Sequence, residues 1–112
     1  MERIYQKLVR DGIPGIIEAK GEIPVTRILS DKEYKKELEK KLQEEYDEVL
    51  NASGKERLAE LADMIEVIKF LAKAENSTFD EVLALANEKR LKNGAFEEKI
   101  FLEKVFEKNE SL

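Results

Sequence analysis

The sequence contains no cysteine and no histidine. Without cysteine the chain cannot form a disulfide framework or a thiolate metal site, and it has no cysteine nucleophile. Without histidine it lacks both the usual general base of enzymes and the usual zinc ligand. Any acid–base chemistry must therefore come from carboxylates, lysines, tyrosines or metal-bound water.

Long apolar runs are missing as well. No run approaches the roughly 20 residues that a membrane span requires, and the start MERIYQKLVRDG lacks the apolar core of a signal peptide. From these two absences we expect a cytoplasmic protein.

The composition predicts a folded, soluble chain. Its 112 residues fit one domain, and 40% charged with 42% apolar residues is not the balance of a disordered chain. The net charge of −5 comes from 25 acids and 20 bases without a block of one sign, which argues against nucleic-acid binding. Local basic residues could still bind a small anion.

Helical signals dominate after an irregular start. Glycines and prolines interrupt the N-terminal segment 1–30, which leaves room for a short helix at 15–20 and an extended piece at 25–29. Ser30 or Asp31 then caps the first of three long helices, and Glu33 is placed to complete a capping box with Ser30. We expect these helices at residues 31–52, 55–75 and 79–93, within a helical core 31–94 followed by a C-terminal arm 95–112. That arm could be a helix or could lie on a partner.

Two groups of acids stand out on the first two long helices, and part of each group lies among apolar residues. They are Glu44, Glu45 and Glu48 on the first helix and Glu60 and Asp63 on the second. At 100° per residue, Glu45 sits inside a buried stripe and Glu48 borders it, whereas Glu44 points away. That stripe comprises Tyr34, Leu38, Leu42, Tyr46 and Val49. On the next helix, Glu60 and Asp63 lie within a second apolar surface. That surface comprises Met64, Val67, Phe70 and Leu71.

The second helix is apolar on nearly all sides, because a further face carries Leu58, Leu61, Ile65, Ile68 and Ala72. A chain this short can hardly surround such a helix alone. We therefore expect an all-α fold in which an antiparallel helical hairpin and a third long helix form a four-helix-bundle-type core that is completed by dimerisation.

A short turn at 51–54 places the two acidic pairs at nearly the same height on the hairpin. Clustered carboxylates resist burial unless a cation neutralises them, and oxygen ligands favour Mg²⁺ or Mn²⁺. The alternative is solvated surface charge, because about five acidic i, i+3 pairs are expected by chance in so acidic a chain.

These motifs resemble the all-alpha nucleotide pyrophosphohydrolases of the MazG type. The likeness is carried by EEYDE at Glu44–Glu48 and ELAD at Glu60–Asp63, which are eleven residues apart. The opening KLVRDGIP and the later EKRLKNGAF are similar to a short, stand-alone branch described as phosphoribosyl-ATP pyrophosphohydrolase-like. Departures are Gly12 in place of a lysine, Asn93 in place of an arginine and Ala95 in place of a glycine. The phosphate-binding ends of the chain are therefore expected to differ from those of the branch.

The resemblance implies a Mg²⁺-dependent hydrolysis of a nucleoside triphosphate to the monophosphate and pyrophosphate, with a house-cleaning role against non-standard nucleotides. It assigns Glu45, Glu48, Glu60 and Asp63 as metal ligands, with Glu45 as the alternative proton acceptor. It favours phosphate contact for Lys7 and Arg10, although an Arg10–Asp11 surface salt bridge would suit the sequence alone. Substrate contacts are also expected on the third long helix, from Asn87, Lys89 and Arg90.

Two other functions fit the same residues. One is hydrolysis of phosphoribosyl-ATP in histidine synthesis, on the same scaffold. The other is a non-catalytic helical dimer in which the acids bind a structural cation or remain solvated.

Overall fold

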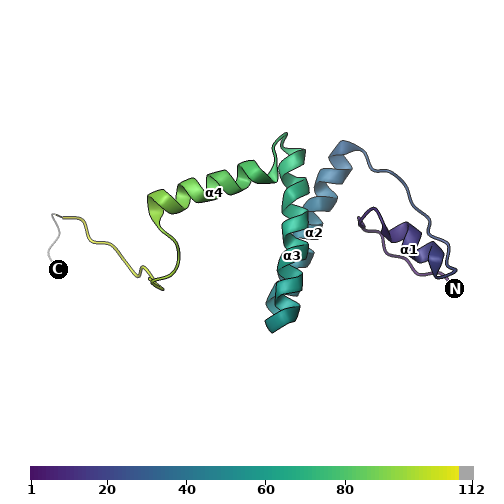
Figure 1. Cartoon of the computed structure of the whole chain (residues 1–112), viewed down its shortest axis with the longest axis horizontal. Coiled ribbons are helices and arrows are strands. Elements are labelled where there is room, and N and C mark those ends of the chain that lie inside the picture. The colour runs from purple at the N-terminus through teal and green to yellow at the C-terminus, as the bar shows by residue number, and fades with distance from the viewer. Residues whose placement is uncertain (109–112) are drawn as a thin grey trace. The chain divides into compact units, whose positions relative to one another are not determined.

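Four helices form the regular structure of the chain. The computed structural model describes residues 1–108, and within this range it contains no strand (Figure 1). The helices are α1 (Ile13–Ala19), α2 (Asp31–Asn51), α3 (Gly54–Ala74) and α4 (Phe79–Asn93). The all-α class predicted from the sequence is confirmed. No helix in the described part of the chain combines the length and apolarity needed to cross a bilayer.

Two compact units divide the chain. Met1–Phe79 form the first, and the second begins at Asp80. The single domain expected from the sequence stays a prediction.

The predicted capping box fixes the start of α2. The Ser30 hydroxyl accepts a hydrogen bond from the Glu33 backbone N–H at 3.2 Å, and the Glu33 carboxylate accepts one from the Ser30 N–H at 3.3 Å. Arg27 also donates to Glu33, at 3.0 Å. Two backbone donors that the helix itself leaves unpaired are thereby satisfied.

An antiparallel hairpin of α2 and α3 forms the body of the first unit (Figure 1). Only Ala52 and Ser53 separate the two helices, and the Arg57 side chain closes this turn by donating to the Ala52 carbonyl at 2.9 Å. At the other end an ion pair joins Lys35, near the start of α2, to Glu75, directly after α3. The turn is shorter than the predicted 51–54, because Asn51 stays helical and Gly54 already belongs to α3.

The packed face of the hairpin is small. Its buried apolar side chains are Leu38 on α2 and Val67 and Ala72 on α3. The expectation that Tyr46 packs in the core is wrong within the described chain, because its side chain is 50% exposed. The reason is rotational: Tyr46 follows Glu45, so when Glu45 faces α3 the tyrosine is turned about 100° away.

A second apolar face of α3 is left uncovered within the described residues. Leu58, Leu61 and Ile65 are 67%, 39% and 43% exposed. The sequence predicted two apolar faces on this helix, and the face that packs against α2 is the one that carries Glu60 and Val67. The hairpin can bury only one of the two apolar faces of α3.

The ends of the chain depart from the prediction in small ways. Helix α1 begins two residues earlier than expected, because Pro14 occupies its first turn, where proline is tolerated, instead of preceding it. No regular structure forms over 25–29. Helix α4 has the predicted bounds and is followed by Gly94, whose φ of +86° suits glycine. Residues 95–108 are not helical, and the last part of the predicted arm, 109–112, lies outside the described residues.

Candidate metal centre

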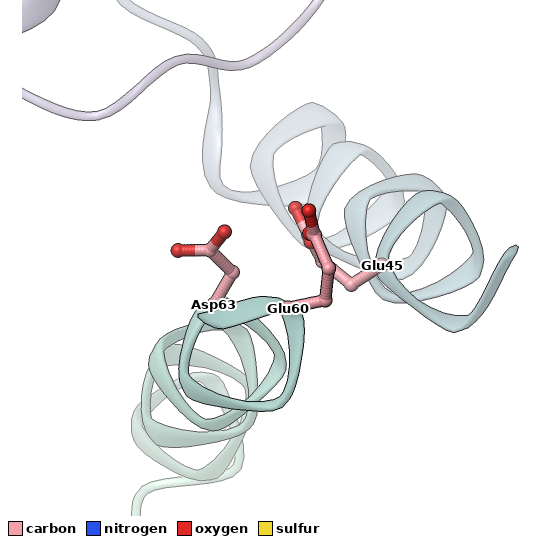
Figure 2. Close-up of side chains that lie close together, drawn as sticks. All are labelled: Glu45, Glu60 and Asp63. Carbon is pink, nitrogen blue, oxygen red and sulfur yellow. The ribbon is translucent and has the colours of Figure 1, made fainter. Parts of the chain in front are cut away.

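Three carboxylates from the two hairpin helices converge in one place. Glu45 comes from α2, Glu60 and Asp63 come from α3, and one oxygen of each lies within 4.8 Å of the others. Figure 2 shows the three side chains turned toward the same side of the hairpin. We call these residues the acidic trio. Its arrangement follows from the turn, because Glu45 lies seven residues before Ala52 and Glu60 lies seven residues after Ser53.

The trio contains buried oxygens that have no hydrogen-bond partner. Glu45 is only 7% exposed. Within the described residues, Oε2 of Glu45 and Oε2 of Glu60 are buried and accept no hydrogen bond. Buried polar atoms almost always have a partner, so two unpartnered carboxylate oxygens in one cluster mark a candidate ligand site. A hard divalent cation is the ligand that such oxygens fit.

The raised pKa values in the trio also favour binding of a cation. Burial raises the pKa of Glu45 to about 7, and the neighbouring charges of Glu48 and Asp63 add to this effect. The pKa of Glu60 is also raised, chiefly by its contact with Glu48, then by burial and by the charge of Asp63. The carboxylates of the trio are therefore less stable when all are negatively charged at once. A bound cation would lower their pKa values and stabilise the charged forms.

Glu48 lies at the edge of this cluster. It was predicted to be a fourth ligand, but it is exposed and is not among the three groups that meet within 4.8 Å. Its effect on the pKa values of Glu45 and Glu60 nevertheless places its carboxylate beside both. Three of the four predicted ligands therefore converge, with Glu48 next to them.

Glu44 does not point away, as the sequence suggested. Its carboxylate is half-buried and accepts hydrogen bonds from Lys41 at 3.2 Å and from Lys7 at 3.5 Å. Burial alone would raise the pKa of Glu44, but the two lysines outweigh it and the pKa is lowered. This glutamate is thus held as a charged group beside the trio.

The N-terminal segment is tied to both acidic motifs through residues 7–11, which we call the strap. Arg10 donates a hydrogen bond to Oδ1 of Asp63 at 2.7 Å, and Lys7 contacts Glu44. The Arg10–Asp11 pair that the sequence alone allowed is replaced by this longer-range pair. No local pattern could have indicated it, because 53 residues separate Arg10 from Asp63.

A pocket of about 250 Å³ lies between the strap and the hairpin. Its lining includes Leu8, Arg10, Tyr34, Glu45, Asp63 and Phe70. A larger hollow of about 620 Å³ lies where α2 begins and α3 ends, and its lining includes Lys32, Lys35, Lys73, Tyr34 and Phe70. That hollow includes no member of the trio, whereas the smaller pocket adjoins Glu45 and Asp63.

The remaining predicted substrate contacts belong to the second unit. Asn87, Lys89 and Arg90 are exposed on α4. Arg90 lies 3.7 Å from a carboxylate oxygen of Glu97 in the same unit. Their proposed contact with substrate stays a prediction.

Comparisons with known proteins add little to this geometry. No protein-family model matches the chain, and no solved structure matches it. An uncharacterized protein of Mycolicibacterium smegmatis is 46% identical over 54 residues, which are 48% of this chain and 55% of that protein. The matched stretch thus spans about half of each protein, and the relative has no assigned function.

Proposed function

We propose that this chain is a Mg²⁺-dependent nucleoside triphosphate pyrophosphohydrolase. The observation that carries the proposal is the Glu45 carboxylate, which is buried, has an unpartnered oxygen and converges with Glu60 and Asp63. Three carboxylates without imidazole or thiolate form the donor set of Mg²⁺ or Mn²⁺. The resemblance in sequence supplies the reaction.

The reaction needs little covalent chemistry from the protein. A water molecule attacks the α-phosphorus of the triphosphate, the bond from that phosphorus to the bridging oxygen of the leaving pyrophosphate breaks, and the water loses a proton. Bound Mg²⁺ supplies charge neutralisation and a more acidic water. Glu45 would either hold the cation or, as the alternative, accept the proton of the attacking water, because its carboxylate lies in the trio.

Basic side chains support the leaving group. Lys7 and Arg10 reach the acidic motifs from the strap, and their cationic groups are placed to neutralise phosphate oxygens beside the trio. The resemblance adds Asn87, Lys89 and Arg90 of α4 to the substrate contacts. The same resemblance is the support for a house-cleaning role against non-standard nucleotides.

We infer that the protein works as a homo-oligomer, in the first place a dimer. The support is the apolar surface of the hairpin, where Leu50 and Leu58 are 58% and 67% exposed near the turn. Apolar side chains gathered on one part of a surface commonly mark an interface.

A substrate panel tests the activity. Purified protein with Mg²⁺ is incubated with canonical and modified nucleoside triphosphates and with phosphoribosyl-ATP, and pyrophosphate release is measured. We expect release from one or more triphosphates and none after EDTA treatment. Cleavage of phosphoribosyl-ATP alone would instead support the histidine-synthesis reaction.

Matched glutamine variants test the site. Glu45→Gln is expected to lower kcat by about 100-fold or more, because it removes either a ligand charge of the cation or the proton acceptor. Glu56→Gln is the control, because Glu56 lies in the first turn of the same hairpin's α3 but is exposed and outside the trio. Equal activities of the two variants, or silence of folded wild-type protein across the panel, would favour the non-catalytic helical module.

A further inference from the structure

The strap ends on a residue of the proposed metal centre. Arg10 Nη2 donates to Asp63 Oδ1 at 2.7 Å, and Asp63 is a member of the acidic trio. The second tie of the strap is different, because Lys7 contacts Glu44, which is not in the trio. The strap thus pairs Arg10 with a member of the trio and Lys7 with a glutamate outside it.

Arg10 and a divalent cation would compete for Asp63. Both are positively charged, so the guanidinium on Oδ1 repels a cation seated among the trio. The ion pair is open to solvent, with the Arg10 and Asp63 side chains 58% and 44% exposed. Exposed ion pairs contribute little to stability, so a divalent cation held by three carboxylates can displace the guanidinium.

We propose that Arg10 is a phosphate-binding residue that the cation releases from Asp63. This inference rests on the proposed function. Before the cation binds, the guanidinium neutralises Asp63. Once the cation is bound, Arg10 turns to the phosphates of the substrate, whose oxygens match its planar set of donors.

The surroundings of Arg10 allow this exchange. Arg10 and Asp63 both line the pocket of about 250 Å³, so a released guanidinium stays beside the space for the substrate. Leu8 is half-buried and Lys7 remains paired with Glu44, and these two contacts keep the strap on the hairpin while Arg10 moves. Arrival of the cation thereby makes a phosphate ligand available at the same place.

The experiment measures Mn²⁺ binding and turnover in the same variant. Mn²⁺ alone is titrated into wild-type protein and Arg10→Ala, and free Mn²⁺ is followed by electron paramagnetic resonance. We expect Arg10→Ala to bind Mn²⁺ about three- to tenfold more tightly, because a nearby positive charge is gone. We expect its kcat/KM for pyrophosphate release to fall at least about tenfold, because a phosphate contact is lost.

Two control variants separate charge from structure. Arg10→Lys keeps the charge and should bind Mn²⁺ as wild type does, with reduced kcat/KM. Arg27→Ala removes an exposed pair with Glu33, which lies 12 residues before Glu45 on α2 and so about 18 Å away along the helix. It should leave both quantities unchanged.

The Mn²⁺ titration is the readout that does not depend on activity. Weaker or unchanged Mn²⁺ binding by Arg10→Ala overturns the inference and makes Arg10 a structural residue. Wild-type protein that binds no Mn²⁺ overturns the proposed function and this inference together.

Discussion

Glu45 shows at the scale of one residue why the hairpin suits a cation. A carboxylate that is 7% exposed loses most of its hydration, and its Oε2 gains no hydrogen bond from the described residues in return. Nearby Glu48 and Asp63 raise its pKa further. The folded protein therefore binds a proton at Glu45 more tightly than the unfolded chain does, and a bound metal would replace that proton.

This pKa makes the stability of the metal-free protein depend on pH. The pKa of Glu45 is raised from an ordinary 4.5 to about 7, so its contribution to stability is complete below about pH 4.5 and is lost as the pH rises through 7. Glu45→Gln removes this titration. Relative to wild type, the variant should gain at most about 3 kcal/mol in free energy of unfolding between pH 4.5 and pH 8.

Urea unfolding in EDTA at the two pH values checks this expectation. Glu56→Gln, which alters an exposed glutamate on α3, should show no such trend relative to wild type. A constant difference between Glu45→Gln and wild type at both pH values would show that the carboxylate is not buried in solution.

At the scale of the elements, the two helix starts of the hairpin differ. Ser30 caps α2 through the reciprocal box with Glu33, whereas Ser53 precedes α3 without a side-chain capping bond. Both residues are serines at N-cap positions, so the structure offers a matched pair for measuring the value of the bond.

Ser30→Ala should lower the free energy of unfolding by about 1 kcal/mol, because a backbone donor of the first turn loses its partner. Ser53→Ala should change it by less than about half of that amount, because it removes no capping bond. Thermal or urea unfolding measures both. A larger loss for Ser53→Ala would contradict the assignment of the cap.

The packed face of the hairpin should be far more sensitive than its open face. Leu38 is 4% exposed, and Leu38→Ala should lower the free energy of unfolding by about 2–4 kcal/mol through lost burial and a residual cavity. Leu50 lies on the same helix but is 58% exposed, so Leu50→Ala should cost less than about 1 kcal/mol in dilute protein. Urea denaturation in dilute solution compares the two variants, and equal losses would contradict the observed rotation of α2.

For the whole molecule, the main open question about the first unit is the apolar face of α3 that α2 leaves exposed to solvent. Leu61 and Ile65 are about two-fifths exposed on a helix whose other apolar face is already packed against α2. Water contact along such a face is unfavourable by about 25 cal/mol per Å² of apolar surface. A second copy of the chain would remove this cost for both partners, which is the basis of the proposed dimer.

Leu61→Lys combined with Ile65→Lys should convert the oligomer to a monomer with unchanged helical content. Two buried charges would oppose the interface, while neither residue belongs to the face that packs on α2. Light scattering coupled to gel filtration measures the mass, and circular dichroism measures the helices. Lys55→Glu, a charge reversal at another exposed position of α3, is the control and should remain oligomeric. Wild-type protein that is monomeric at micromolar concentration would contradict the proposed dimer.

Local chemistry explains why most helix ends could be predicted. The Ser30 box, the short turn after Asn51 and Gly94 after α4 are set by residues that are neighbours in sequence. The convergence of the trio could also be predicted, because a two-residue turn sets the acidic residues of the two helices at similar distances from the turn. Periodicity could not decide which of the two apolar faces of α3 would pack against α2, and it wrongly placed Tyr46 in the buried stripe of α2.

The amino-acid sequence by itself determined the all-α class, the hairpin and the position of three carboxylates near its turn, because helical period and turn length are local properties. Only the tertiary structure decided the burial of Glu45, the displacement of Glu48 to the edge and the contact between Arg10 and Asp63. The reason is that burial and charge pairing depend on the rotation of one helix against another and on where a distant segment lies, and neither is specified by residues adjacent in the chain.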